Sequence, residues 1–190
     1  TVAPYVRRFK IASFEARDVE FIEAHRPHVS RAKPLLVSTG MTTWEELAWA
    51  YDWSCDELFL VHCVSSYPTP AAQLQLLVLR TAFNSHDSYG GRDMGRRPRV
   101  SIDFQGLSDH TDPRDLWTGA LAVAAGATIV EAHLKLDETD PENPDSPHAM
   151  TPAQFKTYVD HIRYVETCLG DGEKRLQDCE QPMAKYRVVS

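Results

Sequence analysis

Two short strings, residues 108–111 (SDHT) and 131–133 (EAH), combine imidazoles with carboxylates at the ends of apolar runs. Their histidines, His110 and His133, are separated by about one strand and one helix, so on neighbouring parallel strands both rings would face one cleft. Two neutral imidazoles with carboxylate and water oxygens suit Mn²⁺, Zn²⁺ or Fe²⁺. The alternative interpretation is that each histidine is half-buried and bonds a backbone carbonyl.

Other polar residues near these strings could support the same chemistry. Asp109 and Glu131 flank the histidines and could orient their rings, or could equally form a helix cap or an ion pair. Glu15 and Asp145 follow apolar runs and could bind sugar hydroxyls or move a proton, although most loop carboxylates are only solvated. Tyr67 lies in a proline-rich turn that would present a phenol whether or not it contacts a ligand.

A lysine lies inside the first apolar run, where an ammonium group is costly unless it meets an anion. Together with nearby hydroxyl side chains it could hold a phosphate group. The alternative is that these small hydroxyls only form turns at strand ends. The residues of this predicted anion site are Lys10, Ser13, Ser38, Thr39 and Ser108.

The composition indicates a hydrophobic core and no strongly charged surface. Of the 190 residues, 43% are hydrophobic and 25% are charged, with a formal net charge of -7. The chain is long enough for one domain, and its mild acidity argues against nucleic acid as a partner. The cysteines lack C-x-x-C spacing, so we expect reduced thiols in a cytoplasmic protein. No segment approaches the roughly 20 apolar residues that span a membrane.

Short apolar runs alternate with amphipathic stretches along the chain. Runs rich in Val, Ile and Leu are typical of parallel strands buried on both faces. We expect five strands, at residues 9–13, 35–39, 58–63, 100–107 and 127–133. The expected helices lie at residues 19–31, 43–51, 73–84, 114–125 and 151–169.

This alternation predicts an α/β fold with parallel pairing and right-handed crossovers. Two architectures fit: an open doubly wound sheet, or an arc of a TIM (β/α)8 barrel. An open sheet concentrates its chemistry at one switch point. Here polar residues follow every expected strand, which is typical of a barrel. We therefore predict a partial TIM barrel, with long loops at residues 85–99 and 138–147.

Several strings occur in a fixed order between about residue 9 and residue 172: FKIASFE, KPLLVSTGMTTWEEL, FLVHCVSSYPTP, GLSDHT and AAGATIVEAHLKLD, followed by PD and MTPAQF. Together they resemble the sialic acid synthase family, whose members make N-acetylneuraminate, legionaminate or pseudaminate or serve spore-coat polysaccharide synthesis. The resemblance implies that residues 1–172 are the later five βα units of the barrel. Residues 173–190 would begin a linker towards a C-terminal antifreeze-like domain.

The resemblance also implies a reaction. Phosphoenolpyruvate would condense with an N-acylated hexosamine, such as N-acetylmannosamine, to give a nine-carbon 2-keto acid and inorganic phosphate in surface-polysaccharide biosynthesis. His110 and His133 would hold a divalent metal that polarises the sugar aldehyde, Mn²⁺ foremost, with Mg²⁺ or Co²⁺ as alternatives. Intact relatives imply a homodimer, in which the C-terminal domain donates an arginine to the partner's active site.

By motif position, the implied roles fall into three groups. Lys10, Ser13, Ser38, Ser65 and Ser108 would hold the phosphate or carboxylate of phosphoenolpyruvate. Glu15 and Glu131 would manage protons or position the enol and water, and Tyr67 and Asp145 would contact the sugar. The sequence departs from the family at Ala132, where Lys or Arg is usual, and at residues 146–148, which read as a lengthened loop.

Two other functions remain open. One is a barrel aldolase that forms a Schiff base on Lys10, and the other is a non-catalytic relative. The chain does not start with Met, and five strands do not close a barrel. We therefore expect a fragment that is not active alone, and the predicted activity is that of the intact protein.

Overall fold

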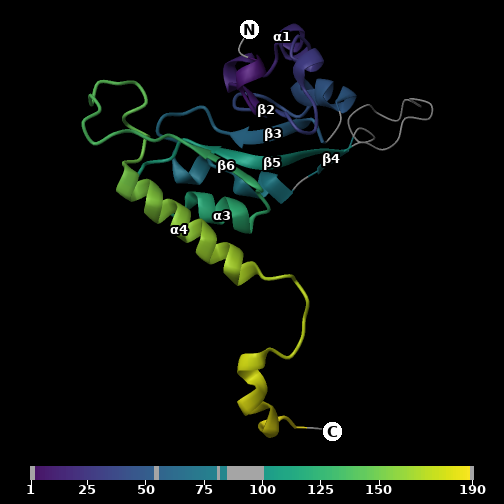
Figure 1. Ribbon diagram of the computed structural model, residues 1–190, viewed down its shortest axis with the longest axis vertical. Helices are drawn as coiled ribbons and strands as arrows, with labels where there is room; N and C mark the ends of the chain where they lie inside the picture. Colours follow the sequence, from purple (N-terminus) through teal and green to yellow (C-terminus); the bar gives the residue numbers. More distant parts are fainter. Residues whose placement is uncertain (1–2, 54–55, 81, 85–100, 189–190) are drawn as a thin grey trace, which may run out of the picture.

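The computed structural model describes residues 3–53, 56–80, 82–84 and 101–188. Its centre is a parallel sheet whose strands lie in the same order in space as in the chain (Figure 1). A short strand, β4 (Ala82–Asn84), pairs antiparallel with the start of β5. The parallel strands are β1 (Phe9–Ile11), β2 (Leu35–Ser38), β3 (Leu58–Cys63), β5 (Ser101–Asp109) and β6 (Ile129–Ala132).

The sheet curls, as an ion pair between its two edges shows. Lys10 on β1 lies with its Nζ 2.9 Å from Oε2 of Glu131 on β6. Four inter-strand steps of about 4.8 Å would separate these strands by roughly 19 Å in a flat sheet, beyond the reach of the two side chains. Sequential strand order without a reversal, combined with this curl, confirms the predicted partial TIM barrel over the doubly wound sheet.

The helical segments are shorter than the sequence predicted. At residues 19–31 only α1 (Val19–Glu23) is α-helical, and Pro27 falls in a separate 3₁₀ turn, Arg26–His28. The segment expected at residues 43–51 is the 3₁₀ helix Glu45–Asp52. The remaining 3₁₀ segments are Ala3–Tyr5, Ser13–Glu15, Ala71–Gln73, Leu76–Arg80 and Asp178–Tyr186.

Two further helix predictions were wrong in their extent. The stretch at residues 73–84 is interrupted where Gln75 adopts a φ of 54°, and it ends in strand β4 rather than in a helix. The helix expected from residue 114 begins only with α3 (Thr118–Ala124). Asp112 organises a turn before it, because its carboxylate accepts hydrogen bonds from the backbone N–H and the guanidinium of Arg114.

The last long helix matches its prediction. It is α4 (Pro152–Leu169), and it begins with a capping box in which Thr151 and Gln154 exchange hydrogen bonds with each other's backbone N–H. Gly170 ends the helix with a φ of 59°, a conformation that a residue without a Cβ adopts easily. The helix packs along α3 (Figure 1).

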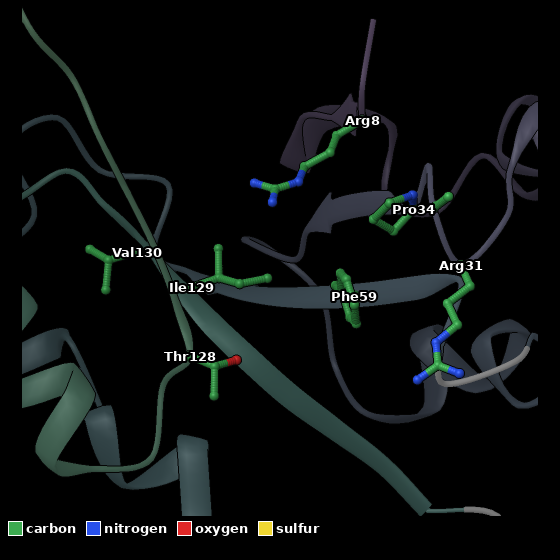
Figure 2. A pocket seen from close by; sticks show the side chains of 8 residues that line it. Arg8, Arg31, Pro34, Phe59, Thr128, Ile129 and Val130 are labelled. Carbon is green, nitrogen blue, oxygen red and sulfur yellow. The ribbon is translucent and has the colours of Figure 1, made fainter.

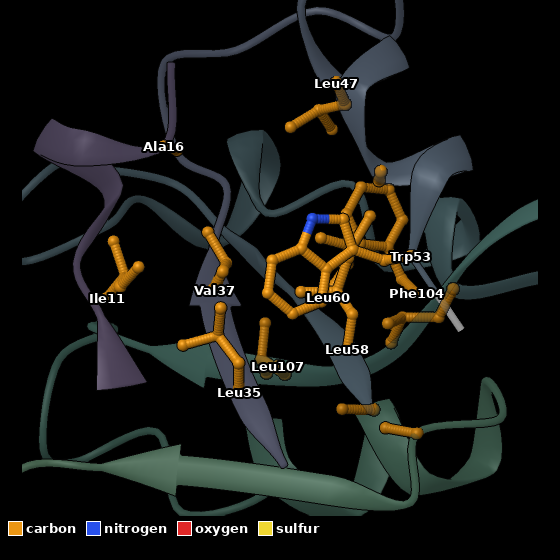
Figure 3. Close-up of a cluster of buried hydrophobic side chains, with 14 of the residues drawn as sticks. Ile11, Ala16, Leu35, Val37, Leu47, Trp53, Leu58, Leu60, Phe104 and Leu107 are labelled. Carbon is orange, nitrogen blue, oxygen red and sulfur yellow. The ribbon is translucent and has the colours of Figure 1, made fainter. Parts of the chain in front are cut away.

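The hydrophobic core lies between the convex face of the sheet and the helical segments that cover it (Figure 3). Residues of one parity on each strand face this core, for example Val37 on β2 and Leu60 on β3. Their neighbours Leu36 and Phe59 face the concave side and are only half-buried. The concave side is therefore the barrel interior, and its residues are those of opposite parity to the core.

A tight contact fixes α3 and α4 to the end of β5. A Cβ added at Gly119 of α3 would lie 2.4 Å from the ring of Tyr158 on α4, so only glycine allows this approach. The buried Tyr158 hydroxyl in turn donates a 2.7 Å hydrogen bond to Asp109 at the end of β5. This chain of contacts determines where the residue after Asp109, His110, lies.

Beyond α4 the chain projects away from the barrel portion and is almost entirely exposed (Figure 1). This segment includes most of the predicted linker at residues 173–190. The long loop predicted at residues 85–99 lies outside the described residues. None of the helices in the described part of the chain combines the length and apolar character needed to cross a bilayer.

Candidate active site

Three imidazoles meet at the carboxyl ends of β5 and β6. The ring centroids of His110 and His133 are 5.0 Å apart, as expected for two histidines that face one cleft. The ring of His148 lies 4.5 Å from His133 and 5.4 Å from His110. One nitrogen from each ring lies within 4.8 Å of the other two, so the set could hold a metal ion.

His148 is the third member of this set, and it was not among the predicted site residues. It lies in the loop after β6, fifteen positions beyond His133, where the sequence indicated only a lengthened loop at residues 146–148. Backbone hydrogen bonds return this loop to the sheet: the N–H of Met150 donates to the carbonyl of His133, and the N–H of Lys135 donates to Met150. A signal was present in the sequence, since Ala149 and Met150 are apolar residues within a polar loop and are buried.

Two of these imidazoles, those of His110 and His148, have lowered pKa values. Burial, followed by the charges of His133 and His148, lowers the pKa of His110 to about 4. Burial and His133 also lower the pKa of His148. Both rings are therefore neutral near pH 7 and each presents a nitrogen lone pair.

Contacts around His110 hold its ring in place. The Sγ of Cys63 on β3 lies 3.6 Å from its Nδ1, and the Tyr67 ring packs on it with centroids 4.6 Å apart. Asp109, one of the two candidates for orienting the rings, points the other way. Its carboxylate accepts hydrogen bonds from the backbone and hydroxyl of Thr111 and from Tyr158, so it stabilises the strand end and does not touch an imidazole.

The predicted sugar-contacting residues lie beside the imidazoles. Tyr67 is 44% exposed, and its ring packs against His148 as well as His110. Asp145 is exposed, with its carboxylate oxygens 3.7 Å from Nδ1 of His133 and 3.8 Å from Nε2 of His148. Both side chains can therefore meet a ligand that enters above the imidazoles.

The other predicted carboxylates differ from each other. Glu131 pairs with Lys10, and Ser108 also hydrogen-bonds it. Burial opposes its ionisation, but the hydrogen bond and charge of Lys10 outweigh this effect and lower the pKa of Glu131. Glu15 is exposed at the end of the turn Ser13–Glu15. The structure thus places Glu131 in an ion pair on the concave face and Glu15 in an exposed turn after β1.

Two of the predicted anion-binding hydroxyls, those of Ser13 and Ser65, meet at Gly40. The Oγ of Ser13 accepts a 2.9 Å hydrogen bond from the Gly40 N–H, and a Cβ at Gly40 would lie 2.2 Å from Oγ of Ser65. Ser38 is 2% exposed, and its Oγ has no hydrogen-bond partner. A buried hydroxyl without a partner is unusual and suggests that a ligand supplies one. We call Lys10, Ser13, Ser38, Ser65 and Ser108 the anion cradle.

Two cavities lie at opposite ends of the strands. One of about 590 Å³ lies at the carboxyl end of β3 and is lined by Cys63 and Ser65, and also by Leu47 and Phe104 of the core-facing side. Another, of about 510 Å³, lies where the strands begin and is lined by Arg8, Arg31 and Phe59 among others (Figure 2). Barrel enzymes place their chemistry at the carboxyl ends of the strands, so the second cavity is not the candidate active site.

Comparison with known proteins shows which family the chain belongs to. The model of the NeuB family matches residues 2–174. An N,N'-diacetyllegionaminic acid synthase of Legionella pneumophila is 33% identical over 190 residues, covering 94% of this chain and 46% of the relative. A pseudaminic acid synthase of Campylobacter jejuni is 34% identical over 189 residues, covering 96% of this chain and 47% of the relative. The chain thus spans about half the length of these relatives.

A solved structure shows the same fold. The crystal structure of an N-acetylneuraminic acid synthetase from Leptospira borgpetersenii superposes with a TM-score of 0.74 at 24% sequence identity. The match covers 96% of this chain and 58% of that chain. The strand order and curl described above are therefore those of part of a sialic acid synthase barrel.

Proposed function

Because the chain belongs to the NeuB family, a family of sialic-type acid synthases, we propose that it forms part of an enzyme that condenses phosphoenolpyruvate with an N-acylated hexosamine. The products would be a nine-carbon 2-keto acid and inorganic phosphate. One observation carries this proposal: a cluster of imidazoles and a lysine-and-serine cradle share one concave face. Such a face offers a metal site beside an anion site, which this pair of substrates requires.

The residues present fit a divalent metal. Both ring nitrogens of the buried His148 lack a hydrogen-bond partner, and the imidazoles beside it are close enough to share an ion. His110 and His133 would hold the metal, Mn²⁺ in our proposal. When bound, it would supply Lewis-acid polarisation of the hexosamine aldehyde.

The anion cradle would bind phosphoenolpyruvate. The Lys10 ammonium and the hydroxyls of Ser13, Ser38, Ser65 and Ser108 are donors suited to its phosphate and carboxylate oxygens. The unpartnered Ser38 hydroxyl would gain an acceptor on binding. Bound here, the methylene carbon of phosphoenolpyruvate would face the imidazole end of the site, where Tyr67 and Asp145 would contact the sugar.

The reaction would then proceed in two stages. The methylene carbon attacks the aldehyde carbon, a C–C bond forms, and the aldehyde oxygen takes up a proton. Water adds to the resulting cationic carbon and loses one proton, which balances the proton taken up by the aldehyde oxygen. The new hydroxyl then gives its proton to the departing phosphate as the C=O bond of the keto acid forms and the C–O bond to phosphate breaks. Glu131, whose pKa Lys10 lowers, would accept the proton from water, and the exposed Glu15 would exchange protons with solvent.

The Lys10–Glu131 pair also argues against the aldolase alternative. A Schiff-base lysine must be an unprotonated amine in order to attack a carbonyl. The Lys10 Nζ lies 2.9 Å from Oε2 of Glu131 and is engaged in an ion pair with it. Borohydride reduction in the presence of pyruvate should therefore give no trapped adduct on Lys10.

Phosphate release tests the proposed function directly. The complete protein that contains this chain is incubated with phosphoenolpyruvate, Mn²⁺ and a panel of N-acyl hexosamines. We expect phosphate release that depends on one of the sugars and is lost in His110→Ala. His28→Ala, a change at an exposed histidine in the turn Arg26–His28, is the matched control and should keep activity. Absence of sugar-dependent release with every hexosamine would refute the proposal.

A further inference from the structure

His148 is buried in a way that its protein contacts do not explain. Its side chain is 1% exposed, and neither Nδ1 nor Nε2 has a hydrogen-bond partner. The nearest charged group, Asp145, places Oδ1 3.8 Å from Nε2, which is too far for a hydrogen bond. A buried polar ring with two unsatisfied nitrogens destabilises a fold unless something else binds them.

The surroundings of His148 indicate what that partner is. Its ring faces His110, His133 and Tyr67, with centroid distances of 5.4, 4.5 and 5.0 Å. The described residues offer neither of its nitrogens a hydrogen bond, whereas three ring nitrogens that lie within 4.8 Å of one another suit a cation.

We propose that His148 is a third metal ligand, so that this protein binds its divalent cation with three imidazoles, from His110, His133 and His148. This inference rests on the metal site of the proposed function, but not on the condensation reaction. An added nitrogen donor favours Co²⁺ and Zn²⁺ over Mn²⁺, since affinity for nitrogen ligands rises from Mn²⁺ to the later metals. The third histidine therefore determines metal preference as well as affinity.

The loop geometry allows the rings to close on one ion. Imidazole nitrogens bind such metals at about 2.0–2.1 Å, which places the nitrogens roughly 3 Å from one another. They now lie within 4.8 Å, so binding requires a movement of about 1–2 Å. His110 follows a well-packed strand, whereas His148 lies on a loop anchored at Met150. We infer that His148 makes most of this movement.

Metal titration of the complete protein tests this assignment without any substrate. The protein is freed of metal with a chelator, and Co²⁺, Zn²⁺ and Mn²⁺ are titrated separately by calorimetry. His148→Phe keeps the ring volume and removes both nitrogens. We expect it to weaken Co²⁺ and Zn²⁺ binding at least about 10-fold, and Mn²⁺ binding by a smaller factor. If His148→Phe binds each of the three metals as tightly as the wild type does, the proposal is overturned.

A matched control and a second readout protect the test from a folding defect. His161→Phe changes another partly buried imidazole, which stacks on Trp117 at 3.8 Å, away from the site, and should leave all three affinities unchanged. Metal-free His148→Phe should unfold at the same temperature as the wild type or higher, because it removes an unsatisfied polar group. Nitrogen-15 NMR of the wild-type histidines should show three imidazoles shifting with Zn²⁺; only two shifting would also refute the third ligand.

The outcomes separate this inference from the proposed function. If His148→Phe loses metal affinity and no hexosamine supports phosphate release, His148 is a metal ligand but the proposed condensation reaction is wrong. If phosphate is released but His148→Phe binds all three metals as tightly as the wild type does, the reaction is supported and the assignment of His148 as a ligand is wrong.

Discussion

The hydrogen bond between Tyr158 and Asp109 supports the end of β5 that leads into His110, and the effect of its loss on stability should be measurable. Tyr158→Phe removes only the hydroxyl, so no cavity forms and the contact with Gly119 eases slightly. The Asp109 carboxylate loses its 2.7 Å hydrogen bond from Tyr158 but keeps the two donors of Thr111. The Asp109 carboxylate therefore loses one of its three hydrogen bonds and keeps the other two.

The expected loss of stability follows from the number of donors that Asp109 retains. A hydrogen bond to a charged group contributes about 1.5–3 kcal/mol, whereas a fully unpaired buried charge costs roughly 3–5 kcal/mol. With two of three donors retained, we expect the free energy of unfolding of the barrel domain to fall by about 2 kcal/mol. For a domain of 150–250 residues this corresponds to a decrease in Tm of roughly 4–8 °C.

Chemical denaturation of the complete protein, followed by tryptophan fluorescence, measures this loss. The control is Tyr164→Phe on the same helix, where the side chain is 63% exposed and the change should stay within about 0.5 kcal/mol. If Tyr158→Phe is as stable as Tyr164→Phe, Asp109 does not depend on this bond and our account of the strand end is wrong.

Three further predictions concern the site. Lys10→Met removes the cation of the anion cradle and should raise KM for phosphoenolpyruvate by roughly 10- to 100-fold, because one hydrogen bond from a charged group is lost. An unchanged KM in steady-state kinetics would exclude Lys10 from the cradle. Gly40→Ala places a methyl group 2.2 Å from Oγ of Ser65 and should raise the same KM while leaving calorimetric Mn²⁺ affinity unaltered; a lowered metal affinity would instead mean that the whole site had shifted. Removal of metal with a chelator should lower Tm by several degrees, because a ligand at about 100 times its Kd stabilises the folded state by about 2.7 kcal/mol. A Tm that does not change with metal would argue against a tight metal site.

The strands were the most predictable part of the fold. β3 was predicted at its observed bounds, because residues buried on both faces leave a continuous apolar run that ends at polar residues. Connecting helices were less predictable. Their sequences have helical periodicity, but each connection is short, and local events such as the positive φ of Gln75 decide where helical geometry stops.

The orientation of Asp109 could have been predicted and was not. Side chains alternate across a strand, so Ser108 and His110 share one face and Asp109 must take the other. On that basis Asp109 is a partner of the helices that cover the barrel and not of the imidazoles. The position of His148 is different, because no periodicity describes a loop. The apolar residues Ala149 and Met150 indicated burial, but not that Met150 would pair with the backbone of His133.

The site therefore has two origins. Strand register alone brings Lys10, Ser38, Ser108 and Glu131 to one face, since Ser108 pairs with Glu131 and Lys10 shares its parity with Ser38. The loops contribute Tyr67, Asp145 and His148. Strand positions are held by the whole sheet, whereas loops change without disturbing the core. In the function we propose, binding of phosphoenolpyruvate, the substrate that would be used with every sugar, would thus fall to the rigid strand positions. The choice of sugar, and the third metal ligand that we propose, would fall to the loops, where this sequence departs from its family at residues 146–148.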